Sequence, residues 1–98
     1  MSSKCQVKCR IREGMFSDEL IAEIRAMDFT GRVSTVSSFV PTEAIERDPK
    51  DSSRGTLIAY CMRTSLGFTS VVLPQDTLEN GASLVVPSED VLQKEGRS

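Results

Sequence analysis

Residues 4–27 read KCQVKCRIREGMFSDELIAEIRAM, and this stretch decides the fold. Its first nine residues alternate between two kinds of side chain. Apolar or thiol side chains occupy one set of positions: Cys5, Val7, Cys9 and Ile11. Polar side chains occupy the other set: Lys4, Gln6, Lys8, Arg10 and Arg12. A period of two places the two sets on opposite faces of a β-strand, so residues 4–12 are predicted to form a strand with one buried face.

The second part of the stretch, residues 18–27, is compatible with two structures. A helix capped by Ser17 would carry one apolar stripe, made of Leu20, Ile21, Ile24 and Met27. A strand would instead pair with residues 4–12 across a loop at residues 14–17. Its register would match apolar with apolar and base with acid in five pairs: Ile11 with Leu20, Cys9 with Ala22, Val7 with Ile24, Arg12 with Glu19, and Lys8 with Glu23. This matching favours the hairpin, and a helix at 18–27 is the alternative.

The rest of the chain predicts further strands separated by polar turns. Runs rich in apolar or β-branched residues lie at 32–40, 56–64, 68–73 and 83–86. Three segments, 39–45, 72–78 and 85–91, share two apolar residues followed by a proline, and each proline is predicted to end its strand in a short helical turn. Residues 46–55 carry six charges and are predicted to form a flexible loop. Residues 94–98 are predicted to be a frayed tail.

These elements predict one small domain spanning residues 1–98. The fold class is mainly β, a small antiparallel barrel or rolled sheet of SH3-like size with five or six strands and short helical turns. The alternative is an α+β fold in which a helix at 18–27 packs against the sheet.

Composition removes most routes to catalysis. The chain contains no histidine, and its six glycines are scattered among turns and the tail, so it offers neither an imidazole nor a glycine-rich phosphate loop. Residues 46–55 lack the spacing of a calcium loop. We therefore expect no enzymatic activity, no metal and no cofactor.

The three cysteines are predicted to be reduced and buried. Cys5 and Cys9 lie about 13 Å apart on one strand, too far to bind one metal ion or to form a disulfide with each other. Cys61 lies in an apolar run, where burial makes a thiol unreactive. Because the number is odd and no apolar segment is long enough to cross a membrane, we expect a cytoplasmic protein that does not enter the membrane.

Two surfaces are candidate binding sites. The first is the hairpin tip with Met15 and Phe16, flanked by Asp18, because large apolar residues are unusual in a turn. These residues either dock on a partner or plug one end of the barrel, and a small core favours the plug. The leading function is a non-enzymatic protein–protein interaction or accessory module, and a homodimer formed through a sheet edge is one form of it.

The second candidate surface is the basic side of the first strand. Lys4, Lys8, Arg10 and Arg12 would bind nucleic acid if their charge were not cancelled. The predicted pairing places Glu19 and Glu23 opposite two of them, and no aromatic side chains are interleaved for base stacking. A nucleic-acid-binding barrel is therefore the alternative function.

Overall fold

The computed structural model describes residues 3–28, 30–78 and 81–93. It contains eight strands: β1 (Ser3–Glu13), β2 (Glu19–Met27), β3 (Val33–Pro41), β4 (Ile45–Asp48), β5 (Asp51–Ser65), β6 (Phe68–Thr77), β7 (Gly81–Pro87) and β8 (Val91–Gln93). Two 3₁₀ turns, η1 (Thr42–Ala44) and η2 (Ser88–Asp90), precede β4 and β8. The tail predicted at 94–98 lies outside the described residues.

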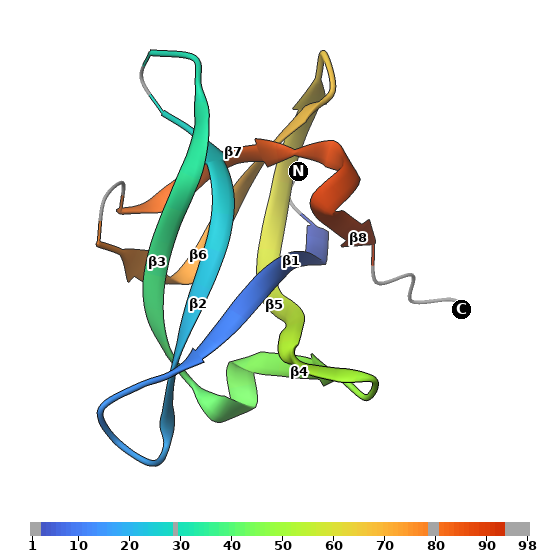
Figure 1. Cartoon of the computed structure of the whole chain (residues 1–98). Coiled ribbons are helices and arrows are strands. Elements are labelled where there is room, and N and C mark those ends of the chain that lie inside the picture. The colour runs from blue at the N-terminus through green and yellow to red at the C-terminus, as the bar shows by residue number, and fades with distance from the viewer. Residues whose placement is uncertain (1–2, 29, 79–80, 94–98) are drawn as a thin grey trace.

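The strands form a nearly closed antiparallel barrel (Figure 1). Following the pairings from β5 through β1, β2, β3 and β6 leads back to β5, because β6 pairs with both β3 and β5. The β3–β6 contact is the weak point, since its register contains the single pair Ser38 and Thr77. Six strands are seven residues or longer, while β4 and β8 are short additions that pair with β5 and β1. The predicted small antiparallel barrel is confirmed.

Residues 19–27 form a strand, so the alternative of a helix at 18–27 is wrong. Their burial alternates, with Leu20, Ala22, Ile24 and Ala26 buried and the residues between them partly or fully exposed. β2 also pairs with neighbours on both sides, β1 and β3. Backbone pairing along both edges and one apolar face outweigh the helix propensity of this segment.

The hairpin register differs from the predicted one by two residues. Ile11 lies opposite Ala22 and Glu13 opposite Leu20, because Gly14 belongs to the hairpin arm and the loop is formed by residues 15–18. An even shift leaves every side chain on its predicted face, so the core assignment survives. The predicted charge pairs do not. Glu23 lies opposite Arg10 and binds Arg12 diagonally, with 3.0 Å between the Arg12 Nη1 and a Glu23 carboxylate oxygen.

Residues 46–55 are paired β-structure, so the predicted flexible loop is wrong. β4 and the first part of β5 form a hairpin whose turn contains Pro49 and Lys50. The Asp48 carboxylate accepts a hydrogen bond of 2.8 Å from the Lys50 backbone N–H and so stabilises this turn. Ile45 at the start of β4 is buried in the core, whereas the rest of the hairpin, from Glu46 to Arg54, is exposed and is held by backbone pairing.

Two of the three predicted proline turns are present. The chain enters η1 after Pro41 and η2 after Pro87. After Pro74 the strand continues, so this third predicted turn is wrong. Pro74 lies where the β6–β7 pairing is interrupted, between Val72 and Thr77, and a residue without an N–H is tolerated at such a position.

The barrel interior contains a disulfide between Cys5 and Cys61, so the prediction of three reduced thiols is wrong for these two residues. Cys61 lies two residues beyond Ala59, the β5 partner of Cys5, and the two Cα atoms are 6.0 Å apart. Cys9 is free and buried, as expected. The thiol-based argument for the cytoplasm no longer holds, and that location stays a prediction. In the described part of the chain no helix has the length and apolar character needed to cross a membrane.

Candidate functional site

The β1–β2 loop carries Met15 and Phe16, the two large apolar residues of the predicted binding tip. Met15 is 89% exposed and Phe16 is 67% exposed, so the prediction that they plug the barrel is wrong. Figure 1 shows why: the two strands continue past the barrel wall, and the loop projects from one end of the molecule. Neither side chain can reach the core from this position.

Backbone hydrogen bonds hold this tip in one conformation. The Gly14 N–H donates to the Glu19 carbonyl, and the Glu19 N–H donates to the Phe16 carbonyl, at 3.2 and 3.1 Å. The Thr42 N–H at the start of η1 donates to the Asp18 carbonyl at 3.2 Å. Gly14 is required here, because a Cβ at this position would lie 2.6 Å from the Glu19 carbonyl oxygen. Met15 and Phe16 therefore lie in a turn that is closed by backbone hydrogen bonds on both sides.

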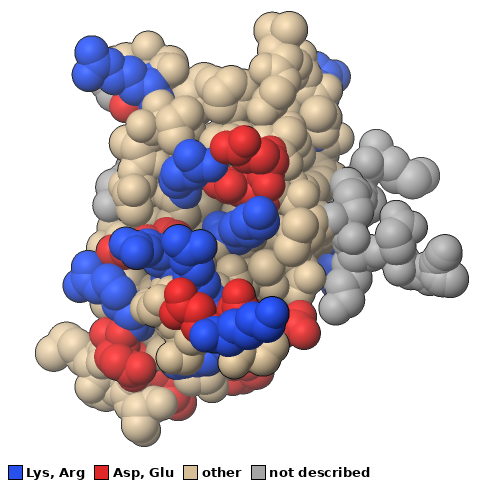
Figure 2. Space-filling model, turned by 45° about the vertical axis from the view of Figure 1, so that its right-hand side comes forward, with Lys and Arg blue, Asp and Glu red and all other residues tan. Residues whose placement is uncertain are grey.

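The surroundings of the tip are apolar on the sheet and acidic on the sides. Phe39, 40% exposed, lies opposite Ile21 on the outer face of β2 and β3 and continues the apolar surface. Acidic side chains occupy exposed positions near the loop: Glu13, Asp18 and Glu43. Figure 2 shows acidic side chains at this lower end of the molecule, with basic side chains next to them. The tip thus combines an apolar end with a negative rim.

The four predicted basic residues lie on the outer side of β1 but do not form one continuous surface. Lys4 lies opposite Tyr60 at the N-terminal end of the strand. Arg12 is ion-paired with Glu23 near the other end. Only Lys8 and Arg10 open into the same depression. The structure therefore brings together two of the four.

That depression is a groove of about 880 Å³ bounded by β1, β2, the β4–β5 hairpin and the segment around η2 (Figure 2). Besides Lys8 and Arg10 it exposes three arginines that sequence reasoning did not place here: Arg25, Arg47 and Arg54. Four acids also line it: Glu23, Glu46, Asp48 and Asp90. These residues come from distant parts of the chain, and no local sequence motif connects them.

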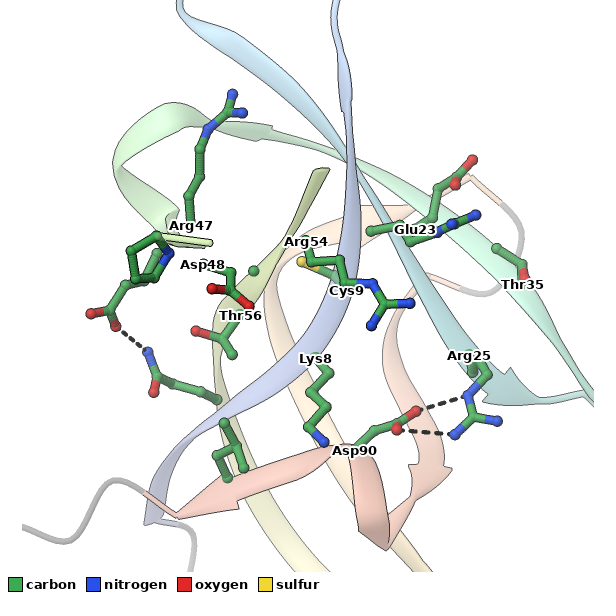
Figure 3. Close-up of a pocket in the computed structure, with 16 residues that line it drawn as sticks. Lys8, Cys9, Glu23, Arg25, Thr35, Arg47, Asp48, Arg54, Thr56 and Asp90 are labelled. Atoms are coloured by element: carbon green, nitrogen blue, oxygen red, sulfur yellow. Dashed lines mark hydrogen bonds and ion pairs between the residues drawn. The ribbon is translucent and has the colours of Figure 1, made fainter. Parts of the chain in front are cut away.

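Arg25 forms the side of the groove next to η2. Its Nε and one terminal nitrogen bind the two carboxylate oxygens of Asp90, both at 3.0 Å (Figure 3). The same terminal nitrogen lies 2.8 Å from a carboxylate oxygen of Glu89. The hydrogen bonds that Arg25 donates to Asp90 and Glu89 raise the pKa of Arg25 above its ordinary value. Arg25 therefore connects η2 to β2, and its charge is already paired with these two carboxylates.

Cys9 lines the groove without offering a nucleophile. Burial raises the pKa of its thiol to about 12, so the thiolate is scarce at neutral pH. No group of three His, Cys, Asp or Glu side chains among the described residues could hold a metal ion. The groove therefore presents basic, acidic and hydrogen-bonding side chains.

The turn beside the groove allows a pH prediction. The Ser53 hydroxyl and backbone N–H donate to Asp51 at 2.6 and 3.0 Å, and this lowers the pKa of Asp51 below its ordinary value of 3.8. A lowered folded-state pKa stabilises the fold above the unfolded-state pKa, and this contribution is lost as the pH falls. We expect Ser53→Ala to raise the pKa of Asp51 in a carboxyl NMR titration. Ser52→Ala is the matched control, and equal shifts in the two variants would contradict the assignment.

No family model, curated protein or solved structure matches this chain. Its function therefore has to be argued from its own residues.

Proposed function

We propose that this domain is a non-enzymatic protein-interaction module that docks through the β1–β2 tip. The observation that carries the proposal is the exposure of Met15 and Phe16, 89% and 67%, on a loop held by backbone hydrogen bonds. Aromatic side chains dominate binding energy at many protein interfaces, and methionine is enriched there. A loop closed by backbone hydrogen bonds loses less entropy on binding than an open one.

The charge around the tip specifies the partner. Asp18 and Glu43 are exposed acids near the apolar end, and Glu13 is a third, although it also lies 3.8 Å from Arg47; negative charge of this kind disfavours nucleic acid and anionic lipid surfaces. A protein with an apolar pocket bordered by basic side chains is complementary to it. Phe39 and Ile21 extend the contact area along the outer sheet face. The tip therefore fits a partner that receives two apolar anchors and a basic border around them.

The alternative function, nucleic-acid binding through β1, has less support. It relies on Lys4, Lys8, Arg10 and Arg12 acting together, yet Arg12 is ion-paired and Lys4 lies outside the groove. A nucleic-acid strand needs a positive path that follows its phosphates.

The test compares a tip variant with a variant at the opposite tip. Met15→Ser/Phe16→Ser removes the proposed anchors, while Leu66→Ser removes another highly exposed apolar residue, 95% exposed, from the β5–β6 loop. Figure 1 shows these loops at opposite ends of the molecule. Because all three side chains are exposed, we expect each variant to unfold within about 0.5 kcal/mol of the wild type. The partner should be captured by the wild type and Leu66→Ser, and lost with Met15→Ser/Phe16→Ser.

Two outcomes of this experiment would overturn the proposal. One is a loss of unfolding free energy of several kcal/mol in the tip variant, which would mean that the residues pack inside. The other is that replacing residues 15 and 16 changes neither the proteins that are captured nor the molecular mass in solution. If the mass falls from dimer to monomer only in the tip variant, the partner is a second copy of this chain.

A further inference from the structure

The outer face of β1 and β5 places like charges directly opposite each other. Arg10 lies opposite Arg54 in the β1–β5 register, and both line the groove. Lys8 lies two positions along β1 on the same face, opposite Thr56. Two cations in a directly opposed cross-strand pair destabilise a sheet unless an anion lies between them. The arrangement therefore costs stability in the free protein and suits an anionic ligand.

Two of the four acids that line the groove are ion-paired with arginines other than Arg10 and Arg54: Glu23 with Arg12, and Asp90 with Arg25. Glu46 and Asp48 accept hydrogen bonds from neutral groups, the Gln6 amide and the Lys50 backbone N–H, and keep their negative charge at the rim. Among the described residues, neither Lys8 nor Arg10 forms an ion pair or a side-chain hydrogen bond, although Glu23 lies opposite Arg10 in the β1–β2 register and the charge of Arg10 helps to lower the pKa of Asp51. Arg54 has one distant partner, Asp51, with 3.8 Å between its Nε and a carboxylate oxygen.

Lys8, Arg10 and Arg54 line one groove. Figure 3 shows the Lys8 side chain directed towards Asp90, and the Arg54 side chain in front of β1 and directed towards β2. The Thr56 side chain lies on the wall beside them. Leu92, 42% exposed, and Pro49 add apolar surface to the same groove. A charged centre is thus combined with apolar walls in a volume typical of small-molecule sites.

We propose that this groove binds a small organic phosphate. The three cations Lys8, Arg10 and Arg54 match the charge of a phosphate group better than that of a carboxylate, which carries a single negative charge. Arginine side chains bind phosphate oxygens in a bidentate geometry, and a threonine hydroxyl donates a further hydrogen bond. The organic part of the ligand contacts Leu92 and Pro49. The acids at the rim limit the positive surface to one phosphate-sized centre, which disfavours a continuous nucleic-acid strand.

Adenosine monophosphate serves as the probe, and adenosine is the matched ligand without a phosphate. In two-dimensional NMR titrations at low salt, we expect saturable shifts of the amides of Lys8, Arg10, Arg54 and Thr56 with the nucleotide and not with adenosine. Arg10→Gln and Arg54→Gln should each raise the dissociation constant by about tenfold or more, since hydrogen bonds to charged groups are strong. Arg63→Gln, an exposed arginine of β5 outside the groove, is the control and should leave the constant unchanged.

Three results would overturn the proposal. These are shifts that do not saturate, equal binding of adenosine and its monophosphate, and equal weakening by Arg63→Gln and Arg10→Gln. Tighter binding of a single-stranded oligonucleotide than of the mononucleotide, with a steep salt dependence, would assign the groove to nucleic acid instead. The thermal midpoint of each variant is the control for an intact fold, and none of the substitutions alters the β1–β2 tip. The test is therefore independent of the protein-interaction proposal.

Discussion

Removing the Cys5–Cys61 disulfide is expected to lower the free energy of unfolding by about 4 kcal/mol, because the bridge closes a loop with a sequence separation of 56 residues. The cross-link restricts the unfolded chain, and a longer closed loop gives a larger effect. Its sulfur atoms are also part of the barrel core, since Cys5 is fully buried and Cys61 nearly so. The double variant Cys5→Ala/Cys61→Ala is the appropriate comparison, since a single substitution leaves a free thiol behind.

Urea denaturation of the oxidised protein and the double variant measures this difference. A thiol count in the unfolded, unreduced protein provides the independent control: Cys9 should react, and Cys5 and Cys61 should not. Equal unfolding free energies before and after reduction would contradict the account. So would three reactive thiols per chain.

Ile24→Ala is expected to lower the free energy of unfolding by about 3 kcal/mol, through lost apolar contact and the cavity that remains. Ile24 is fully buried at the centre of β2. Ile21 is the matched control, because the strand directs it to the outer face, where it is only half-buried. We expect Ile21→Ala to cost about 1 kcal/mol or less.

The pair of variants distinguishes the strand from a helix. A helical stripe would bury both isoleucines, so the two substitutions would then cost the same. Chemical denaturation of both variants provides the comparison. A clear excess for Ile24→Ala agrees with the alternating burial of β2, and equal losses would contradict it.

The buried face of β1 could be predicted because polar and apolar side chains alternate without exception from Lys4 to Arg12. The face of β2 followed from matching its apolar residues to those of β1. The exact register could not, because a shift of two residues preserves the same match of apolar and polar faces. What decides between the two registers is the place of Gly14, whose close approach to Glu19 becomes visible only in three dimensions.

The hairpin at residues 46–55 could not be predicted from the sequence, for a related reason. Its stability comes from backbone hydrogen bonds between β4 and β5, which leave no mark in side-chain composition. The disulfide was hidden because it depends on the pairing of β1 with β5, which brings together cysteines from opposite halves of the chain. Sequence periodicity identifies a strand and its buried face, whereas it does not identify the partner of that strand.

The candidate sites show the same division. Met15 and Phe16 could be singled out from the sequence because large apolar residues are rare in turns. Their exposure depends on how far the hairpin extends beyond the barrel. The groove could not be anticipated, since Arg54 lies in the segment expected to be a loop and Asp90 reaches Arg25 across 65 residues.

The recovery of bound proteins with the tip variant, relative to the Leu66→Ser variant, tests the central claim most directly. Both variants remove exposed apolar side chains, so the ratio cancels effects of nonspecific surface hydrophobicity. The account predicts at least one protein whose recovery falls about tenfold or more with Met15→Ser/Phe16→Ser and is unchanged with Leu66→Ser. A ratio near one for every recovered protein, with all variants folded and monomeric, would contradict it.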